Sequence, residues 1–592
     1  MSAASTSGPV RTYPRQRWVV APAHLEESAA LASAAHLPTV LAELLVARSI
    51  TSTTEALAFL YPDISHLHDP LAMKGMAAAV ERVERAIAAR EPVLLYGDYD
   101  VDGTTAVVLL KTAIEMLGGV VRFHVPHRIR EGYGLQSSVL QAAYADGVRL
   151  VITVDTGMRA FAEALAARQI GLDLIITDHH LPAADETVPD ALAILNPNQP
   201  GCGYPEKSLC GAAIAFKLAQ ALLERRDAAR TREKTLPSFL KMAAIATIAD
   251  AVPLRGENRA IAALGLRELR KPVGAGLRAL FQAAALDPAN KQITGFDVAF
   301  RLAPRINAAG RMDVASEIVE LFCTRDAARA GELATKLETL NRQRRDAEAE
   351  ALAIIEARLA EDSSFAADRL LVVEGDGWHR GVIGILASRV VERTAKPAIV
   401  ISVEDGIAHG SGRSIDGFPL LQAIETCSDL FTRFGGHAFA VGFAMPSDHL
   451  PELRRRINLH AAERLAGTEP EQVLKIHAEL PLDRITPVLA GWLRKLEPLG
   501  HGNPEPVFVA RRVRLVSDPR TMKERHIRLE LAQDGMTSGV MRCVGWDWAG
   551  RCVALELTAG SVVDVAYRIR ENDHPDFGGI EIEIAGLQIP EL

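Results

Sequence analysis

The chain is poor in cysteine and has neither a long apolar run nor a nucleotide-binding loop, and each shortage argues against a class of protein. Its 592 residues include six cysteines and no CxxC pair, a pattern that fits a reducing compartment and argues against a structural zinc site. No apolar run of about 18 residues occurs, and the first residues lack the apolar core of a signal peptide. No Walker A motif indicates nucleotide-driven translocation. The sequence therefore predicts a cytoplasmic protein without membrane contact.

Length and charge narrow the possibilities further. A chain of 592 residues is several times the usual domain size, so we expect several domains. The formal net charge of −8 argues against a protein that coats DNA non-specifically. It leaves room for a local basic groove on an otherwise acidic surface.

Residues 92 to 224 alternate short β-branched runs with helical patterns. The runs read VLLYG, VVRFHV, LVITVD, LDLIIT and ALAILN. Such apolar runs, without strict alternation, are typical of parallel strands covered by helices on both faces. Because ligands of these sheets bind beyond the carboxyl ends of the strands, the residues that follow each run are the candidates for a site.

Three further regions follow this α/β pattern. Residues 325 to 361 form one long charged helical pattern with a leucine stripe, which we interpret as a connector. A second α/β pattern covers about 366 to 462, and the last strands alternate with period two, which favours a small β-barrel of the OB type. We expect five parts: an N-terminal region 1–72, a parallel-sheet catalytic domain 73–323, a connector helix 324–362, a smaller α/β substrate-binding domain 363–465 and an OB-fold nucleic-acid-binding domain 466–592.

Three carboxylates occupy alternate positions directly after the first strand. Asp98, Asp100 and Asp102 lie in the segment GDYDVDG, and this crowding of negative charge calls for cations. A calcium loop of the EF-hand type needs a glutamate at its twelfth position, where this chain has Leu109, and a helix where it has a strand. An acidic surface loop without metal remains an alternative for this segment alone.

Other element ends add ligand-type residues. LVITVD ends in Asp155, and LDLIIT leads into Asp178, His179 and His180. Taken alone, this triplet fits equally well a capping aspartate with two hydrogen-bonded histidines. Asp250 follows an apolar helical stretch, where a buried carboxylate is costly without a cation or partner. Since the strand ends converge, we expect a site of oxygen and imidazole ligands, which suits Mn²⁺ or Mg²⁺.

These motifs carry a family resemblance. GDYDVDG, the VD of TVDTG, TDHH and the TIAD segment resemble, in this order, the four motifs of the DHH phosphoesterase superfamily. Within it, further segments resemble the RecJ family of single-strand-specific DNA exonucleases. They are PHRIREGYGL (126–135), LCGAAIAFKL (209–218), RLAPRINAAGRM (301–312), GWHRGVIGILASR (377–389), GSGRS (410–414), FGGHAFAVGF (434–443) and LGHGNPEPVF (499–508). The resemblance covers roughly residues 75 to 592.

The resemblance implies a catalytic centre with two divalent ions, Mn²⁺ or Mg²⁺. The implied ligand sets share one residue: Asp100 and Asp155 for one ion, and Asp102, Asp155, His179 and Asp250 for the other. Asp98 lies close to the first ion as a further candidate ligand, and His180 is expected to support the site or the scissile phosphate. Two such ions activate water and stabilise the attacking and leaving oxygens.

Seven side chains in glycine-rich segments are candidates for substrate contact: Arg128, Arg305, Arg311, His379, Ser411, Arg413 and His437. Guanidinium groups bind phosphate in bidentate fashion, whereas any single arginine can instead pair with a neighbouring carboxylate. The resemblance implies that the second α/β domain lies over the metal site and that Ser411 and Arg413 hold the 5′-terminal phosphate. His379 and His437 either touch substrate or only satisfy a turn.

The predicted barrel contains the clearest basic stripe of the chain. Its basic members are Arg511, Arg512, Arg514, Arg520, Lys523, Arg525 and Arg528, against the acids Asp518 and Glu524. On barrel strands these residues would form a groove that tracks the phosphates of a single strand, and a solvated basic face is the alternative. The nearby aromatic candidates for base stacking are Phe508, Trp546 and Trp548, so the groove is expected to depend more on charge.

The resemblance implies an exonuclease that degrades single-stranded DNA from 5′ to 3′ into 5′-mononucleotides, in DNA recombination and repair. Its implied partners are single-stranded DNA, a single-strand-binding protein and a helicase, and we expect a monomer. One alternative is a smaller DHH phosphoesterase acting on short oligonucleotides, cyclic dinucleotides or pyrophosphate, but such proteins lack the terminal barrel. The other is a non-catalytic replication scaffold, which would be expected to have lost metal ligands that this chain keeps.

Overall fold

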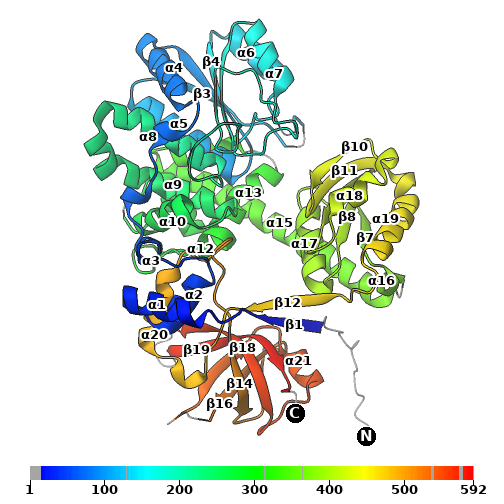
Figure 1. Ribbon diagram of the computed structural model, residues 1–592. Coiled ribbons are helices and arrows are strands. Elements are labelled where there is room, and N and C mark those ends of the chain that lie inside the picture. The colour runs from blue at the N-terminus through cyan, green and yellow to red at the C-terminus, as the bar shows by residue number, and fades with distance from the viewer. Residues whose placement is uncertain are drawn as a thin grey trace.

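The chain forms three lobes joined by one long helix and one extended ribbon (Figure 1). The computed structural model describes residues 15–590 except 129, 133, 272, 313, 314, 363, 535, 537, 538 and 573–577. The lobes are a parallel-sheet domain, a smaller α/β domain and a C-terminal barrel. The predicted fold class, with its parallel sheet, long connector helix, second α/β domain and OB-type barrel, is confirmed.

The first lobe is built on an all-parallel sheet with strand order β3-β2-β4-β5-β6. Its strands are β2 (Pro92–Gly97), β3 (Val120–His124), β4 (Leu150–Val154), β5 (Asp173–Thr177) and β6 (Ala193–Leu195). One face packs on α4 (Met76–Ala89), α5 (Val101–Met116) and α8 (Gly211–Arg230), and the other on α6 (Ser137–Ala145) and α7 (Phe161–Gln169). Helices on both faces explain why the strands are apolar throughout.

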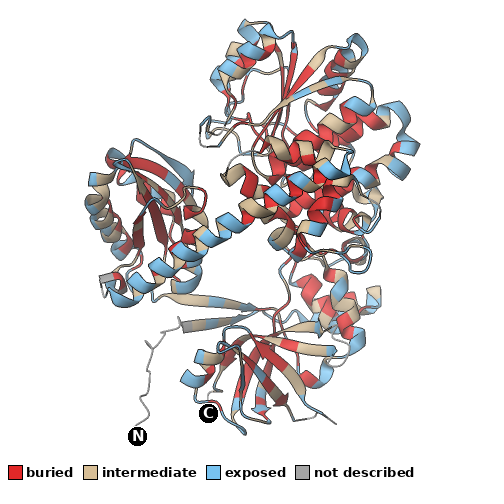
Figure 2. Ribbon diagram, turned by 180° about the vertical axis from the view of Figure 1, so that it is seen from behind, coloured by how far each residue is buried: buried red, intermediate tan, exposed pale blue. Residues whose placement is uncertain are grey.

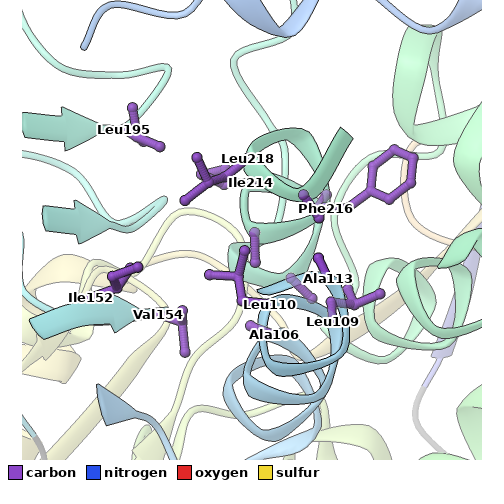
Figure 3. Close-up of a cluster of buried hydrophobic side chains, with 14 of the residues drawn as sticks. Ala106, Leu109, Leu110, Ala113, Ile152, Val154, Leu195, Ile214, Phe216 and Leu218 are labelled. Atoms are coloured by element: carbon purple, nitrogen blue, oxygen red, sulfur yellow. The ribbon is translucent and has the colours of Figure 1, made fainter. Parts of the chain in front are cut away.

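The core beneath α5 and α8 fixes where the strand ends point. Leu110 of α5, Ile214 and Leu218 of α8, and Ile152 of β4 lie in one buried cluster between the helices and the sheet (Figure 3). All four side chains are fully or almost fully buried. Such close-packed interiors hold the attached backbone firmly, so the carboxyl ends of β2 and β4 are rigid supports.

A helical layer and a long helix extend this lobe. The layer contains α9 (Leu236–Ala249), α10 (Gly256–Glu268), α11 (Ala275–Ala283), α12 (Gly295–Asp297), α13 (Ala303–Met312) and α14 (Ser316–Cys323). Helix α15 (Ala327–Glu361) buries Leu333 and Leu337 here and Ala351 and Ile355 in the second lobe. Residues 342 to 350 between them include no buried residue, so α15 crosses between the lobes in solvent (Figure 2). The predicted connector is confirmed.

The second lobe has a mixed sheet with strand order β10-β11-β9-β8-β7, in which only β7 and β8 run parallel. Its strands are β7 (Leu371–Asp376), β8 (Ala398–Glu404), β9 (Ile407–Arg413), β10 (Arg433–His437) and β11 (Ala440–Pro446). Its helices are α16 (Ser364–Ala367), α17 (Ile383–Thr394), α18 (Leu420–Glu425) and α19 (Leu450–Arg464). Helix α17 is the crossover of the single parallel pair and packs over β8 and β9.

The third lobe is a seven-stranded sheet in which β14, β18, β19, β17 and β16 close into a barrel, because β14 pairs with both β18 and β16. Its strands are β13 (Ala478–Glu479), β14 (Phe508–Leu515), β15 (Arg520–Met522), β16 (His526–Ala532), β17 (Met541–Gly545), β18 (Val562–Asn572) and β19 (Gly579–Gln588). Helix α20 (Pro487–Leu493) lies between β13 and β14, and α21 (Ala549–Ala554) lies between β17 and β18.

The N-terminal region belongs to this third lobe, which the sequence did not predict. Its helices are α1 (Leu25–Ala35), α2 (Thr39–Val46) and α3 (Thr53–Leu60). Leu41, Leu44 and Leu45 share a buried cluster with barrel residues such as Phe508 and Val513. Strand β1 (Arg15–Val20) pairs in parallel with β12 (Glu471–Ile476), which leads into the barrel. The two ends of the chain thus meet in one lobe (Figure 1).

No single described helix has the length and hydropathy to cross a membrane. The pair Leu25–Ala35 and Thr39–Val46 meets the criteria only together, on length and composition alone, and is bent by 118° at its break.

Candidate active site

The first three carboxylates lie where β2 passes into α5. Asp100 is the N-cap of α5, and its side chain accepts a hydrogen bond from the Gly103 backbone N–H at 3.0 Å. A side chain at Gly103 would bring a Cβ to 2.6 Å from the Asp98 backbone. This close approach and the cap fold the acidic segment tightly against the helix start, so Asp98, Asp100 and Asp102 share one small space.

Helix α8 holds Asp102 from the other side. The Asp102 carboxylate accepts hydrogen bonds from the backbone N–H groups of Gly211 (2.6 Å) and Ala212 (2.8 Å), at the start of α8. The partial positive charge of a helix N-terminus stabilises a carboxylate in this position. A Cβ on Gly211 would lie 2.6 Å from the Cβ of Asp155, so glycine lets the two carboxylates approach.

Asp155 follows β4 in a left-handed backbone conformation, with φ of 60°. Its Oδ1 lies 3.2 Å from Nε2 of His179. Within the described part of the chain, neither this oxygen nor Oδ1 of Asp98 receives a hydrogen bond, although both are buried. Buried carboxylate oxygens without a donor are costly, and cations would satisfy them.

The two histidines after β5 have different surroundings. Nδ1 of His179 lies 3.9 Å from a carboxylate oxygen of Asp250, the C-cap residue of α9, and its Nε2 lies 3.9 Å from Asp102. Nδ1 of His180 instead lies 2.7 Å from Asp178. Asp178 also accepts hydrogen bonds from three backbone N–H groups. His179 therefore faces the acidic cluster, while Asp178 orients His180.

The structure brings all seven predicted catalytic residues together. Their ligand atoms form three sets in which all atoms lie within 4.8 Å of one another: Asp98, Asp100 and Asp155; Asp102, His179 and Asp250; and Asp155, His179 and His180. The first two sets resemble the two implied ligand sets, with Asp98 added to the first and Asp155 absent from the second. Oxygen-rich sets with one imidazole fit Mn²⁺ and Mg²⁺ by the chemistry of their donors.

The electrostatics agree with a cation site. Burial, followed by the charge of Asp100, raises the pKa of Asp98 to about 8. Burial, followed by the charges of Asp102 and Asp100, raises the pKa of Asp250 to about 9. Burial and neighbouring carboxylates also raise the pKa of Asp155 far above its ordinary value. These groups resist ionisation by themselves, so cations are needed to hold them charged near pH 7.

Asp178 and His180 behave in the opposite way. Burial would raise the pKa of Asp178, but hydrogen bonds from His180 and from backbone N–H groups lower it below its ordinary value. Burial would lower the pKa of His180, but the hydrogen bond and charge of Asp178 raise it. The pair is therefore a satisfied ion pair that fixes the ring of His180.

Guanidinium groups from two lobes face this acidic cluster. Nη1 of Arg311, on α13, donates to the carbonyl oxygen of Gly381 in the second lobe at 2.8 Å. Burial, followed by the charges of Arg128, Arg344 and Arg413, lowers the pKa of Arg311 to about 10. Arg128 lies over the ring of Tyr99, beside the acidic segment, at 5.2 Å from its centroid. Positive charges gathered in this way favour an anion between the lobes.

Ser411 and Arg413 lie on one face of β9, above the first turn of α17. Nη1 of Arg413 donates to Oγ of Ser411 (3.3 Å) and to the carbonyl of Gly412 (2.8 Å). A Cβ on Gly384 of α17 would lie 3.1 Å from both side chains. The two residues therefore meet a helix N-terminus, which is favourable for a phosphate.

The other three substrate candidates differ in their surroundings. Nδ1 of His379 accepts a hydrogen bond from the Gly381 N–H, so this ring satisfies a turn. His437 lies exposed on the edge strand β10. Nε of Arg305 lies 2.6 Å from the Glu338 carboxylate on α15, the alternative considered for an isolated arginine. That contact favours a structural role, and the phosphate roles of all three remain predictions.

The basic stripe of the barrel is only partly available. Arg511 pairs with Asp564 at 2.8 Å, and Arg525 pairs with Asp547 at 3.2 Å. Arg514, Arg520 and Arg528 are exposed, and Arg520 lies directly opposite Arg528 in the β15–β16 pair. Like charges placed opposite each other are unfavourable without an anion, so this pair is the stronger phosphate candidate.

One prediction about stacking was wrong. Phe508 and Trp548 are buried in the barrel cluster, since apolar strand and helix residues there fill the core. Trp546 is 56% exposed and is the member of the predicted trio that can meet a base.

The sequence analysis missed two supporting residues. Oδ1 of Asn307, on α13, accepts a hydrogen bond from the Val101 N–H at the start of α5, at 3.1 Å. A Cβ on Gly310 would lie 2.4 Å from the carbonyl oxygen of Tyr99. Both residues lie in the segment RINAAGR, in which the sequence analysis predicted a role only for the two arginines. The small residues beside them were the available signal, because small side chains permit close backbone approach.

Known protein families match each of the three lobes in turn. Residues 92–247 match the DHH family, N-terminal domain; residues 365–463 match the DHHA1 domain; and residues 476–585 match the RecJ OB domain. A parallel sheet with carboxylates and histidines at its strand ends, in this order, defines a metal-dependent phosphoesterase of the DHH class.

Relatives over most of the chain narrow the class. The single-stranded-DNA-specific exonuclease RecJ of Dickeya dadantii is 37% identical over 83% of this chain and 86% of its own length. That of Bacillus subtilis is 36% identical over 90% of this chain, which spans 66% of the relative. Crystal structures of Thermus thermophilus RecJ with Mn²⁺ and with Mg²⁺ superpose with TM-scores of 0.82 and 0.77, at 29% and 28% identity. Both cover 98% of this chain, and 80% and 79% of theirs. The chain belongs to the RecJ family.

Proposed function

We propose that this chain is a metal-dependent exonuclease that degrades single-stranded DNA from its 5′ end and releases 5′-mononucleotides. The observation that carries the proposal is the convergence of seven carboxylate and imidazole side chains opposite arginines from a second lobe. Relatives of this chain carry the name of single-stranded-DNA-specific exonuclease. The family resemblance extends the proposal to a role in DNA recombination and repair.

Two divalent ions, Mn²⁺ or Mg²⁺, are the proposed cofactors. The orphaned oxygens of Asp98 and Asp155 support this choice, because cations would satisfy them. Asp100 with Asp155, joined by Asp98, is the proposed first ligand set; Asp102, His179 and Asp250, sharing Asp155, form the second. When bound, such ions lower the pKa of water and stabilise charge on the attacking and leaving oxygens of a phosphodiester.

The protein's own groups would orient the strand. Ser411 and Arg413 would bind the terminal 5′ phosphate over the start of α17, so that only the first phosphodiester reaches the carboxylates. Arg128 and Arg311 would bind the scissile phosphate from the side of the first lobe. The end-binding pocket would therefore set the polarity, since the two-metal chemistry is the same at every phosphodiester.

The barrel would bind the strand farther from its end. Arg514, Arg520 and Arg528 are exposed on strands of an OB-type barrel, a fold that commonly carries single strands in a charged groove. This lobe is why we prefer a DNA substrate of some length to the cyclic dinucleotides or pyrophosphate of smaller DHH phosphoesterases. The complete set of ligand side chains also favours catalysis over a scaffold role.

The family resemblance extends the proposal to the cell. We infer that the enzyme acts as a cytoplasmic monomer, together with a single-strand-binding protein and a helicase that supply its substrate. Co-purification of the chain with each partner, with and without nuclease treatment, would separate direct contacts from contacts through DNA.

The test uses single strands labelled at the 5′ or the 3′ end, incubated with Mn²⁺, Mg²⁺ or a chelator. We expect the 5′ label to appear first as a mononucleotide with either ion, no product with chelator, and little cleavage of a blunt duplex. An Asp102→Asn protein purified in parallel controls for contaminating nucleases. First release of the 3′ label, or turnover in chelator, would contradict the proposal.

A further inference from the structure

The carboxylate of Asp250 has few contacts within its own lobe that would fix its position. Asp250 ends α9, and among the described residues only Nδ1 of His179, at 3.9 Å, lies within ion-pair distance of its carboxylate. The next residue, Ala251, has φ of 56°, a left-handed conformation that non-glycine residues rarely adopt. A carboxylate at the negative end of a helix, before a strained turn, needs support from elsewhere.

That support comes from the segment that leads into the barrel strands. Nδ1 of His501 donates to the carbonyl oxygen of Ala251 at 2.7 Å, and the N–H of Leu254 donates to the carbonyl oxygen of His501 at 2.8 Å. Nε of Arg255 donates to the carbonyl oxygen of Gly502 at 2.9 Å. Three hydrogen bonds thus clamp the turn of residues 251–255 from one side.

Close packing adds to these bonds. A Cβ on Gly502 would lie 2.9 Å from Cβ of Pro253, and a Cβ on Gly500 would lie 2.9 Å from a methyl carbon of Leu254. Gly500 and Asn503 exchange two backbone hydrogen bonds, at 3.0 and 3.1 Å. The loop of residues 500–503 is therefore a compact unit pressed directly against the turn.

Two buried side chains anchor this loop to the rest of the molecule. Asn503 is fully buried, and its amide group donates to the carbonyls of Leu496 and Pro498, while its oxygen accepts from Nε of Arg48 at 2.8 Å. Arg259, on α10 of the first lobe, is 2% exposed and donates to four backbone carbonyls of residues 495–498 and to that of Phe59. The loop thus has a fixed base, to which α10 itself contributes.

We propose that the loop of residues 500–503 is a positioning element for the metal ligand Asp250, with His501 as its principal positioning residue. The inference rests on the proposed function, since it assumes that Asp250 binds a divalent ion. It gives the third lobe a role in building the metal centre, besides binding the strand. Removing a residue that is hydrogen-bonded to a metal ligand commonly lowers metal affinity or activity by about 10- to 100-fold. His501 acts one residue away from the ligand, on the carbonyl of Ala251, so we expect the lower end of that range.

The test compares full-length variants by calorimetric titration with Mn²⁺ alone and by steady-state cleavage of single strands. We expect His501→Ala to weaken one of the two Mn²⁺ sites about tenfold and to lower kcat with little change in KM. His501→Asn keeps a donor near the position of Nδ1 and should recover most of the affinity. His449→Ala is the matched control, because His449 also offers Nδ1 to a backbone carbonyl, that of Leu430 at 3.0 Å, but in the second lobe.

Strand affinity measured in chelator separates this role from DNA binding. We expect it to be equal in wild type and His501→Ala. Wild-type Mn²⁺ affinity in His501→Ala would overturn the inference, as would a loss of strand affinity with both metal sites intact. A wild-type chain that binds Mn²⁺ but cleaves no strand would overturn the proposed function instead, and its titration would still report on His501.

Discussion

The two α/β lobes place groups of opposite charge beside the N-terminus of a helix. In the first lobe, Asp98 and Asp155 follow parallel strands, and the start of α5 carries Asp100 and Asp102. In the second lobe, Ser411 and Arg413 lie on β9 and approach Gly384 in the first turn of α17. The helix start in the first lobe thus collects acceptors for cations, and that in the second lobe collects donors for an anion. The comparison suggests a division in which the first lobe performs hydrolysis and the second recognises the strand end.

The strongest way to break this comparison is to remove the shared carboxylate of the first lobe. Asp155→Ala should lower kcat by about 10³-fold or more, the scale for a residue that acts within a catalytic unit. Because Asp155 is buried among like charges, its removal should leave the melting temperature of the chelated protein unchanged or higher. Mn²⁺-dependent turnover with labelled single strands measures the first effect and thermal melting the second. Near-normal turnover in a folded variant would refute the site.

The second lobe should respond to Arg413→Ala in a different way. A guanidinium contact to a terminal phosphate contributes about 1.5 to 3 kcal/mol, or about tenfold to a hundredfold in rate if expressed in the transition state. The variant should lose most of the preference for 5′-phosphorylated over 5′-hydroxyl strands. The ratio of kcat/KM values for the two substrates measures it. Arg455→Ala, on the outer helix α19 of the same lobe, is the control, and an undiminished preference in Arg413→Ala would move the pocket elsewhere.

Metal removal should make the acidic edge sensitive to pH. The pKa values of Asp98 and Asp250 are raised in the folded chain, to about 8 and about 9, from the ordinary 3.8. Their protonation therefore favours folding at acidic pH, and this contribution is lost as pH rises through the folded pKa values. Bound ions reverse the trend, because they replace protons on the ligands and stabilise the fold by about 2.7 kcal/mol at 100 times Kd.

The difference in melting temperature between Mn²⁺-loaded and chelated protein should therefore grow from pH 6 to pH 9. An Asp250→Asn variant should show a smaller growth, since one titrating group is gone. A difference that stays constant across this range would argue against ionised carboxylates as the ligands.

The smallest effects are expected from arginine substitutions in the barrel. They compare the exposed pair Arg520 and Arg528 with Arg511, which is already paired with a carboxylate. Each phosphate contact contributes about 0.7 to the slope of log affinity against log salt for single strands. The pair Arg520→Gln and Arg528→Gln should flatten this slope more than Arg511→Gln, whose guanidinium is already paired with Asp564. Fluorescence anisotropy in chelator at several salt concentrations measures it. Equal slopes for all proteins would remove the barrel from the binding path.

Local patterns in the sequence were sufficient for much of the architecture. Helix α15 was predicted because Leu333 and Leu337 recur at helical spacing in a charged segment, and the structure buries both. The metal ligands were predicted because carboxylates after apolar strands, such as Asp155 after β4, gather at one sheet edge by topology alone. Periodicity and element ends are local properties, so a single sequence displays them.

Partnerships between distant residues were not visible in the same way. The sequence around Arg305 shows an arginine among small residues. It does not show that the partner of this arginine, Glu338, lies on another helix. Phe508 and Trp548 have the composition of stacking residues, yet closure of the barrel turns them into its core. The helical pattern of α2 indicates that Leu41 and Leu45 need a partner surface. It cannot say that this surface is made by strands more than 400 residues later in the chain.

The packing of α1–α3 on the barrel affects the order in which the parts of the chain can fold during synthesis. A ribosome adds about 5 to 20 residues per second, so roughly 25 to 110 s separate the emergence of α3 from that of β19. During this time Leu41, Leu44 and Leu45 have no barrel to cover them, while the first two lobes can already fold. Helices α1–α3 are thus made well before the barrel strands on which they pack. During this interval their apolar residues stay exposed, a condition that favours aggregation.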